Sequence, residues 1–300
     1  MVITFENVSL RFPGEKEPLL HSVSFHLQRG ETVVVTGASG SGKSSLLYLM
    51  NKLYPHNIDA EMKGNIYFFN RCSTSYAPGE VNRHIGTIFQ NPDTQFCMPT
   101  ITEEFAFTLE TNNFSRAAMN KKIPSALKTF QLAQLKDAVI QPLSGGTKQR
   151  VAASCALIYE PQVLLLDEPL SHLDPFTAQQ FVRWLQDIQE KQQLTIIVIE
   201  HQLALWGDFF DRRLHVENQT VCEKTFPTFH HVPLHAKRRV EHLPVALSCK
   251  HWTVNKGQTT IVQDAQFQLR FGAITSLLGP NGAGKSTLFE SFIEHQQKDT

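Results

Sequence analysis

The feature that most constrains the fold of this chain is a glycine-rich pattern that occurs twice. Gly37-Ala38-Ser39-Gly40-Ser41-Gly42-Lys43-Ser44 and Gly279-Pro280-Asn281-Gly282-Ala283-Gly284-Lys285-Ser286 both read Gly-x-x-x-x-Gly-Lys-Ser. A shift of 242 residues superimposes the two stretches without a gap. Outside the pattern, Phe25, Leu27, Gly30 and Leu46 then coincide with Phe267, Leu269, Gly272 and Leu288. The period is that of a whole domain, so we predict an internal duplication.

Each copy of the pattern is typical of a phosphate-binding loop, or P-loop. Its glycines let backbone N–H groups approach an anion at the positive end of a helix. Lys43 can bring a charge to the β- and γ-phosphates of a nucleotide, and Ser44 can offer a hydroxyl to Mg²⁺. The predicted nucleotide-binding residues are Gly37, Ala38, Ser39, Gly40, Ser41, Gly42, Lys43, Ser44 and Ser45, with Gly279, Gly282, Gly284, Lys285, Ser286 and Thr287 in the second copy.

The second copy is incomplete, because Thr300 corresponds to Ile58 of the first copy under the same shift. We therefore expect a complete α/β domain over residues 1–225, a linker over 226–245 and the N-terminal part of a second domain over 246–300. The linker is rich in proline and histidine. Its histidines have no nearby cysteine or carboxylate at ligand spacing, which favours a solvated linker over a metal site.

Short continuous apolar runs predict strands that are buried on both faces of a parallel sheet. They lie at 32–35, 163–166 and 196–199. Helical patterns lie between them, and Asp174-Pro175 is typical of an N-cap followed by proline at the first helical position. Between about 91 and 150 the sequence is helical and amphipathic, which indicates an inserted helical subdomain.

Charge and cysteine usage narrow the class of protein. The 28 basic and 28 acidic residues cancel, so there is no electrostatic case for a nucleic-acid partner. The five cysteines form no Cys-x-x-Cys pair, which argues against zinc and against a secreted disulfide framework. The N-terminus has no signal-peptide pattern, and the apolar runs are too short to span a bilayer. Any membrane role is therefore expected to depend on a partner.

Two adjacent carboxylates, Asp167 and Glu168, follow the apolar run at 163–166. Side by side at the end of a buried strand they would repel each other and lose hydration. A Mg²⁺ ion offsets both costs. We predict that Asp167 binds the metal and that Glu168 polarises the attacking water.

Leu143-Ser144-Gly145-Gly146-Thr147-Lys148-Gln149-Arg150 resembles the signature motif of ABC-type ATPases. Gln90 stands at the Q-loop position, Ser171-His172-Leu173-Asp174 resembles the D-loop, and His201 stands at the switch histidine. Phe12 stands where the family stacks an aromatic ring on adenine. The resemblance implies ATP and Mg²⁺ as cofactors, and a parallel sheet core with an antiparallel β-subdomain and an inserted helical subdomain. It implies catalytic roles for Glu168, His201 and Gln90, metal binding by Ser44, Gln90 and Asp167, and nucleotide binding by Phe12, Ser144, Gly145, Gly146 and Asp174.

The stretch from Gln90 to Phe96 resembles the Q-loop region of ATPases of energy-coupling factor (ECF) importers. The Glu200-His201 pair and the duplication resemble the fused two-domain ATPases of that group. The resemblance implies import of a vitamin or vitamin precursor, possibly thiamine-related, or of a metal ion. It implies a membrane scaffold, a substrate-binding membrane subunit and a place at the cytoplasmic face of the membrane. Residues 95–107 are expected near the scaffold, with about half of their apolar side chains in the subdomain core.

Two departures and two alternatives accompany this resemblance. Thr147 replaces the usual glutamine of the signature motif, and His172 replaces a small D-loop residue. In the family, two domains sandwich ATP head to tail, so this chain is expected to need a second ATPase domain from another copy or from a paralogous subunit. A soluble tandem ATPase of the translation-factor type is one alternative, although the linker is not a long charged helix. A fragment that binds nucleotide without turnover is the other.

Overall fold

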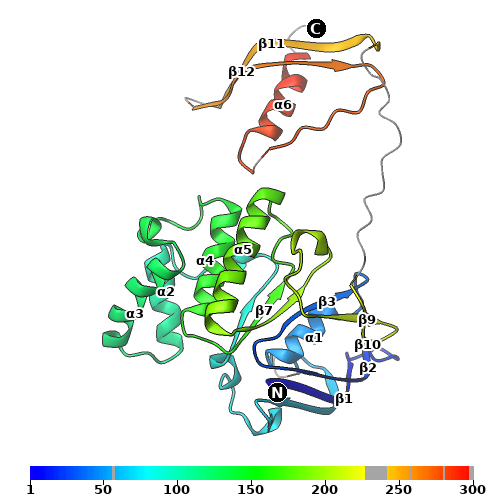
Figure 1. Ribbon diagram of the computed structural model, residues 1–300, viewed down its shortest axis with the longest axis vertical. Helices are drawn as coiled ribbons and strands as arrows, with labels where there is room; N and C mark the ends of the chain where they lie inside the picture. Colours follow the sequence, from blue (N-terminus) through cyan, green and yellow to red (C-terminus); the bar gives the residue numbers. More distant parts are fainter. Residues whose placement is uncertain (56–57, 227–241, 257–258, 280, 297–300) are drawn as a thin grey trace. The chain divides into compact units, whose positions relative to one another are not determined.

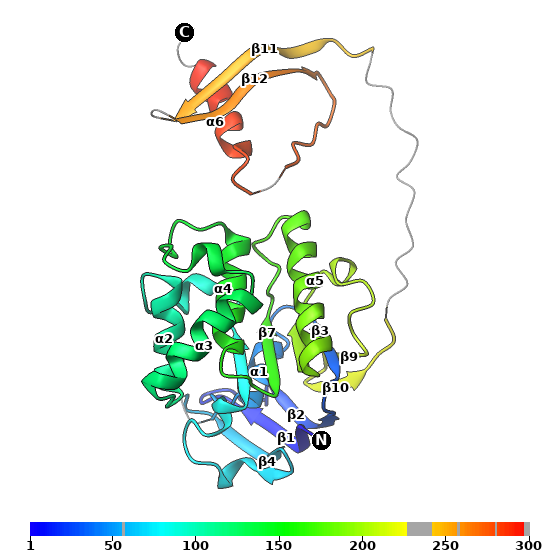
Figure 2. The ribbon, with the colours of Figure 1, turned by 60° about the vertical axis from the view of Figure 1, so that its left-hand side comes forward.

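The computed structural model describes residues 1–55, 58–226, 242–256, 259–279 and 281–296 (Figures 1 and 2). These residues fall into two compact units. The first runs from residue 1 to 226 apart from Asp174–Phe176, and the second contains those three residues and the described part from 242 onwards. Most of the predicted linker, 227–241, lies outside the described residues. In the part of the chain that is described, no helix has the length and apolar character needed to cross a membrane.

A six-stranded sheet forms the centre of the first unit, in the order β10-β9-β3-β8-β7-β6. Its strands are β3 (Thr32–Gly37), β6 (Ile85–Ile88), β7 (Val163–Asp167), β8 (Thr195–Ile199), β9 (Arg212–Glu217) and β10 (Thr220–Glu223). All neighbours pair in parallel except β9 and β10, which are antiparallel. The apolar runs seen in the sequence are β3, β7 and β8. Every residue of β7 and β8 is buried, as expected for strands covered on both faces.

Alternate residues of these strands contribute to two separate hydrophobic cores. Leu164 and Leu166 of β7 belong to one core, whereas Val163 and Leu165 belong to the other. Val34 of β3 likewise faces the first core and its neighbours face the second. This alternation follows from the two-residue period of a strand, which points successive side chains to opposite faces.

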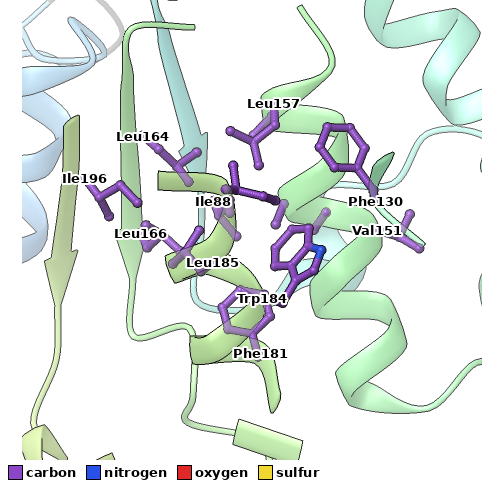
Figure 3. Packing of buried hydrophobic residues seen from close by; sticks show 14 of the residues in the cluster. Ile88, Phe130, Val151, Leu157, Leu164, Leu166, Phe181, Trp184, Leu185 and Ile196 are labelled. Carbon is purple, nitrogen blue, oxygen red and sulfur yellow. The ribbon is translucent and has the colours of Figure 1, made fainter. Parts of the chain in front are cut away.

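The first core is covered by α2 (Ile101–Thr111), α3 (Arg116–Thr129), α4 (Gly145–Leu157) and α5 (Pro175–Gln192). Figure 3 shows Phe181 and Trp184 of α5 beside Phe130 and the strand residue Leu166. The Trp184 ring centroid lies 5.6 Å from that of Phe181 and 6.2 Å from that of Phe130. Helices α2 and α3 lie together at one side of the unit (Figures 1 and 2). The predicted helical insertion is therefore present.

The second core lies between the parallel sheet, α1 (Lys43–Met50) and a four-stranded antiparallel sheet. That sheet has the order β2-β1-β4-β5 and consists of β1 (Ile3–Arg11), β2 (Leu20–Leu27), β4 (Glu61–Phe68) and β5 (Arg71–Cys72). The backbone N–H of His21 donates to the carbonyl of Gln219, 2.6 Å away, and so joins the two sheets at their edges. The α/β fold with an antiparallel β-subdomain is confirmed.

The second unit contains an antiparallel hairpin and one helix. The hairpin consists of β11 (Val245–Lys256) and β12 (Thr259–Arg270), and the helix is α6 (Lys285–Gln296). Phe292 of α6 packs on the hairpin, with ring centroids 6.2 Å from Trp252 and 5.6 Å from Phe267. Residues 273–279, where the 242-residue shift would put a counterpart of β3, do not form a strand, and Ile274 and Leu278 are exposed.

Candidate functional site

The predicted catalytic side chains of the first unit lie where four parallel strands end. Strand β3 leads into the P-loop, β6 leads to Gln90, β7 ends at Asp167 and β8 leads to His201. The register places Val35 beside Ile199, Ile199 beside Asp167 and Ile88 beside Leu166, so the four ends are level. Open parallel sheets bind ligands at this edge.

The P-loop follows β3 in a conformation that requires glycine. Gly37 has φ 153°, and a Cβ there would lie 2.6 Å from the carbonyl oxygen of Val216. Gly42, the N-cap of α1, has φ 99° and no side chain to cap the helix. The first turn of α1 therefore presents backbone N–H groups at the positive end of the helix, the usual environment for a phosphate.

Lys43 is buried and folds back over its own loop. Its ammonium donates to the carbonyls of Gly37 and Ala38, at 3.1 and 2.7 Å. Burial lowers the pKa of Lys43, and the charges of Glu168 and Asp167 oppose that shift. Lys43 therefore lies within electrostatic reach of both predicted acidic residues.

Asp167 is buried at the end of β7 and accepts a hydrogen bond from the Ser44 hydroxyl. Burial raises the pKa of Asp167, and the neighbouring Glu168 raises it further. Ser44 and Lys43 act in the opposite direction. The structure thus brings two predicted metal ligands together, Ser44 and Asp167, in a place that disfavours an uncompensated negative charge.

The Glu168 carboxylate lies between Gln90 and His201. The Gln90 side-chain amide donates to Oε2 of Glu168 at 2.9 Å, and Nε2 of His201 lies 3.2 Å from Oε1. The backbone of Glu168 has φ 45°, a left-handed conformation that costs a residue with a side chain about 1–2 kcal/mol. Its N–H donates to the Ile199 carbonyl at 3.0 Å, which fixes this turn to β8. The three predicted catalytic residues are therefore in mutual contact.

Phe12 lies near the P-loop. Its ring packs edge-on against Tyr54 at 5.8 Å between centroids. Phe12 lines a cavity of about 380 Å³ whose wall also includes Gly40 and Ser41. The predicted adenine contact and the predicted phosphate loop thus share one cavity.

The signature residues form a separate group at the start of α4. The Ser144 side chain caps the helix by accepting from the Thr147 N–H, and the two hydroxyl groups lie 2.9 Å apart. Gly145 and Gly146 occupy the first turn, and a Cβ on Gly146 would lie 2.1 Å from Cγ2 of Thr177. In the described residues, no hydrogen bond or ion pair joins this group to the P-loop. Asp174 lies at the start of α5, where its carboxylate accepts from the Phe176 N–H at 3.1 Å.

The second P-loop repeats one contact of the first. The Lys285 ammonium donates to the Gly279 carbonyl at 2.7 Å, as Lys43 does to Gly37, and α6 begins at Lys285. Gly284 packs close to Ile261, where a Cβ would lie 2.5 Å from a methyl group. Gly282, Ser286 and Thr287 lie in the same loop and first helical turn, and Pro280 is outside the described residues.

The residues of the first unit fit a magnesium nucleotide. Ser41 in the P-loop has a buried hydroxyl without a hydrogen-bond partner among the described residues, and the loop has no room for a Cβ at Gly37. Carboxylate, hydroxyl and amide oxygens from Asp167, Ser44 and Gln90 are the ligand types that Mg²⁺ prefers. The donors and the charge balance therefore suit this group.

Sequence reasoning missed two contacts around this site. Lys148 of α4 and Asp93 of the turn after Gln90 form an ion pair with 2.7 Å between Nζ and Oδ1. Glu104, buried in α2, accepts from the backbone N–H groups of Cys97 and Met98 at 2.9 and 2.7 Å. Both pairs join segments by a fold, and no spacing in the sequence indicates them.

The chain belongs to the ABC transporter family, whose model matches residues 20–171 and 262–300. It is 35% identical to YkoD of Bacillus subtilis, a protein whose name assigns it to HMP/thiamine import as an ATP-binding component. That match covers 96% of this chain and 60% of YkoD. The chain thus spans about three fifths of the length of this relative.

Two solved structures share the fold of the first unit. CbiO1 from Clostridium perfringens, described as part of the ABC transporter complex CbiONQ, has 26% identity and a TM-score of 0.66. The match covers 74% of this chain and 86% of CbiO1. A dimeric ATP-binding cassette in a post-hydrolysis state, bound to ADP and phosphate, has 25% identity and a TM-score of 0.62, covering 76% of this chain and all of that one.

Proposed function

We propose that this chain binds and hydrolyses ATP to energise an importer of the ECF type. The observation that carries the proposal is the contact of Glu168 with both Gln90 and His201, next to the Ser44–Asp167 pair and Lys43. The names of YkoD and of the CbiONQ complex support an importer. The transported compound in this proposal is a thiamine-related pyrimidine or another vitamin, with a metal ion as the remaining choice. No observation favours the translation-factor alternative.

In the proposed mechanism the backbone N–H groups of the P-loop and the Lys43 ammonium hold the β- and γ-phosphates. Glu168 accepts a proton from the attacking water. Gln90 and His201 orient the Glu168 carboxylate through its two oxygens. Ser44, Asp167 and the Gln90 amide oxygen would hold Mg²⁺, which when bound neutralises charge on the phosphate oxygens. Phe12 stacks on the adenine ring.

The signature residues act on a second nucleotide in this proposal. Ser144, Gly145 and Gly146 form their own group in the first unit, and a related cassette is dimeric with ADP and phosphate bound. We infer that these residues face the γ-phosphate held by another ATPase domain, supplied by a second copy or by a paralogous subunit. The second P-loop, with Lys285, is assigned the binding of phosphate.

A cavity of about 610 Å³ supports a membrane partner. It lies between β6, α2 and α4 and is lined by Phe96 and Phe107, while Phe105 of the same segment is fully buried. The expected division of residues 95–107 into core and accessible apolar side chains is thus present. We assign the accessible ones to a contact with a membrane scaffold that also carries a substrate-binding subunit. This contact would hold the chain at the cytoplasmic face of the membrane.

Replacement of the general base tests this function. Glu168→Gln keeps the hydrogen bonds to Gln90 and His201 but cannot take up the proton. We expect ATP turnover, measured as phosphate release, to fall at least about 100-fold while ATP binding is retained. Glu190→Gln, on the exposed side of α5, is the control and should be fully active. Near-normal turnover in Glu168→Gln would remove Glu168 from its assigned role. Uptake of labelled pyrimidine precursor or thiamine by cells with and without the gene tests the substrate.

A further inference from the structure

The turn after β6 is held as a closed unit by its own side chains. Gln95 reaches back to β6, where its Oε1 accepts from the Phe89 N–H at 3.0 Å and its Nε2 donates to the Thr87 carbonyl at 3.3 Å. Asn91 caps the 3₁₀ turn Pro92–Thr94 (η3) by accepting from the Asp93 N–H at 3.0 Å. A turn with this many internal bonds moves as one piece when any part of it is displaced.

Two side chains project from this turn to other elements. Gln90, at its start, donates to Glu168. Asp93, at its middle, pairs with Lys148 at 2.7 Å. The Lys148 side chain is only 13% exposed, so its ammonium relies on this carboxylate for charge compensation. The turn is thus fixed at one end to the catalytic carboxylate and at the other end to α4.

Lys148 lies in the first turn of α4, next to the signature residues. Its N–H donates to the Ser144 carbonyl at 2.9 Å. A displacement of this end of α4 therefore moves Lys148, and through Asp93 it moves the turn that carries Gln90. The contacts form one path from Ser144 to the Glu168 carboxylate.

We propose that Asp93 and Lys148 are positioning residues for ATP hydrolysis. Their ion pair transmits the position of the signature end of α4 to the Gln90 amide and thereby sets the orientation of Glu168. This inference rests on the proposed function of Glu168 and Gln90. It assigns neither Asp93 nor Lys148 a contact with ATP or with water. Loss of the pair therefore lowers kcat and leaves the KM for ATP unchanged.

The first measurement does not depend on activity. Hydrogen exchange of the intact chain without nucleotide should become faster over residues 90–95 in Asp93→Asn and in Lys148→Met. The control is Lys122→Met, which removes another partly buried ion pair, with Glu160, that joins α3 to the end of α4 without touching the turn. The control should exchange as the unmodified chain does over residues 90–95. Unchanged exchange in both Asp93→Asn and Lys148→Met overturns the proposal.

The second measurement is steady-state ATP turnover with the same variants. We expect Asp93→Asn and Lys148→Met each to lower kcat roughly tenfold with KM for ATP within about twofold, since small misplacements of catalytic groups cost this much or more. Asp93→Lys should be worse, and the swap Asp93→Lys with Lys148→Asp should recover most of the loss. Faster exchange with unchanged kcat, or a swap no better than its single variants, contradicts the positioning role. An inactive unmodified chain defeats the proposed function instead, and the exchange data then decide on the ion pair alone.

Discussion

At the residue scale, Asp167 shows how a functional group can reduce stability. It is buried beside Glu168, and both burial and this neighbour raise its pKa above the ordinary 3.8. A raised carboxyl pKa means that the folded state disfavours the charged form. This cost is present in full above the folded-state pKa and disappears as the pH falls towards 3.8, where the group is protonated in the folded and unfolded states.

Asp167→Asn should therefore raise the melting temperature at pH 7.5 while it weakens Mg²⁺-dependent ATP binding. The amide keeps an acceptor for the Ser44 hydroxyl and carries no charge. The gain should shrink as the pH is lowered towards 4. Thermal denaturation in a pH series, with the exposed Asp187→Asn as control, measures this. A lower melting temperature at pH 7.5 would show that the interactions with Lys43 and Ser44 outweigh burial.

At the element scale, the start of α2 depends on a buried carboxylate. Thr100 and Glu103 form a capping box, while the buried Glu104 ties the preceding loop to the helix through the N–H groups of Cys97 and Met98. Glu104→Ala leaves both donors buried without this acceptor. We expect a loss of about 1–3 kcal/mol in the free energy of unfolding.

Chemical denaturation measures the effect of Glu104→Ala. Glu110→Ala, at an exposed position near the end of the same helix, is the matched control and should change the free energy of unfolding by less than about 0.5 kcal/mol. Equal losses in the two variants would mean that the contacts of Glu104 with the loop contribute nothing beyond helix propensity.

Strand β3 and residues 273–279 show how much an element depends on its surroundings. The two stretches correspond under the 242-residue shift, and both precede a P-loop and a helix. β3 is fully buried between β8 and β9, whereas Ile274 and Leu278 are exposed and 273–279 forms no strand. Among the described residues of the second unit, no strand corresponds to β8 or β9. A parallel strand needs neighbours for its hydrogen bonds, so the local pattern alone does not produce it.

At the scale of the whole molecule, the two groups of nucleotide-binding residues lead to a prediction about assembly. The Lys43 and Ser144 groups share no hydrogen bond in the first unit, and a related cassette is a dimer. If each ATP lies between a P-loop and the signature residues of another chain, association must precede hydrolysis. ATPase activity per chain should then fall as the protein is diluted below its dissociation constant.

Phosphate release over a dilution series from micromolar to nanomolar protein measures this dependence. Added Glu168→Gln chain is a useful control, because it supplies signature residues without a base of its own and should restore activity to the diluted chain. Activity per chain that stays constant throughout the series would contradict the need for a second ATPase domain.

The sequence by itself determined the fold class and the identities of the residues at the site. A P-loop requires glycines because no Cβ fits at Gly37, and a buried parallel strand requires a continuous apolar run, as in β7. These requirements are local, so they are visible in short stretches of sequence. The duplication was visible for the same reason.

Only the tertiary structure decided which distant side chains meet. Gln90, Glu168 and His201 are in contact because β6, β7 and β8 are neighbours in register, and the pairing of Asp93 with Lys148 depends on how α4 packs beside the turn after β6. An ion pair or a shared proton acceptor leaves no periodic signal in a single sequence, because its two members are related by packing and not by spacing. The same reason explains why residues 273–279 have the pattern of β3 but not its structure.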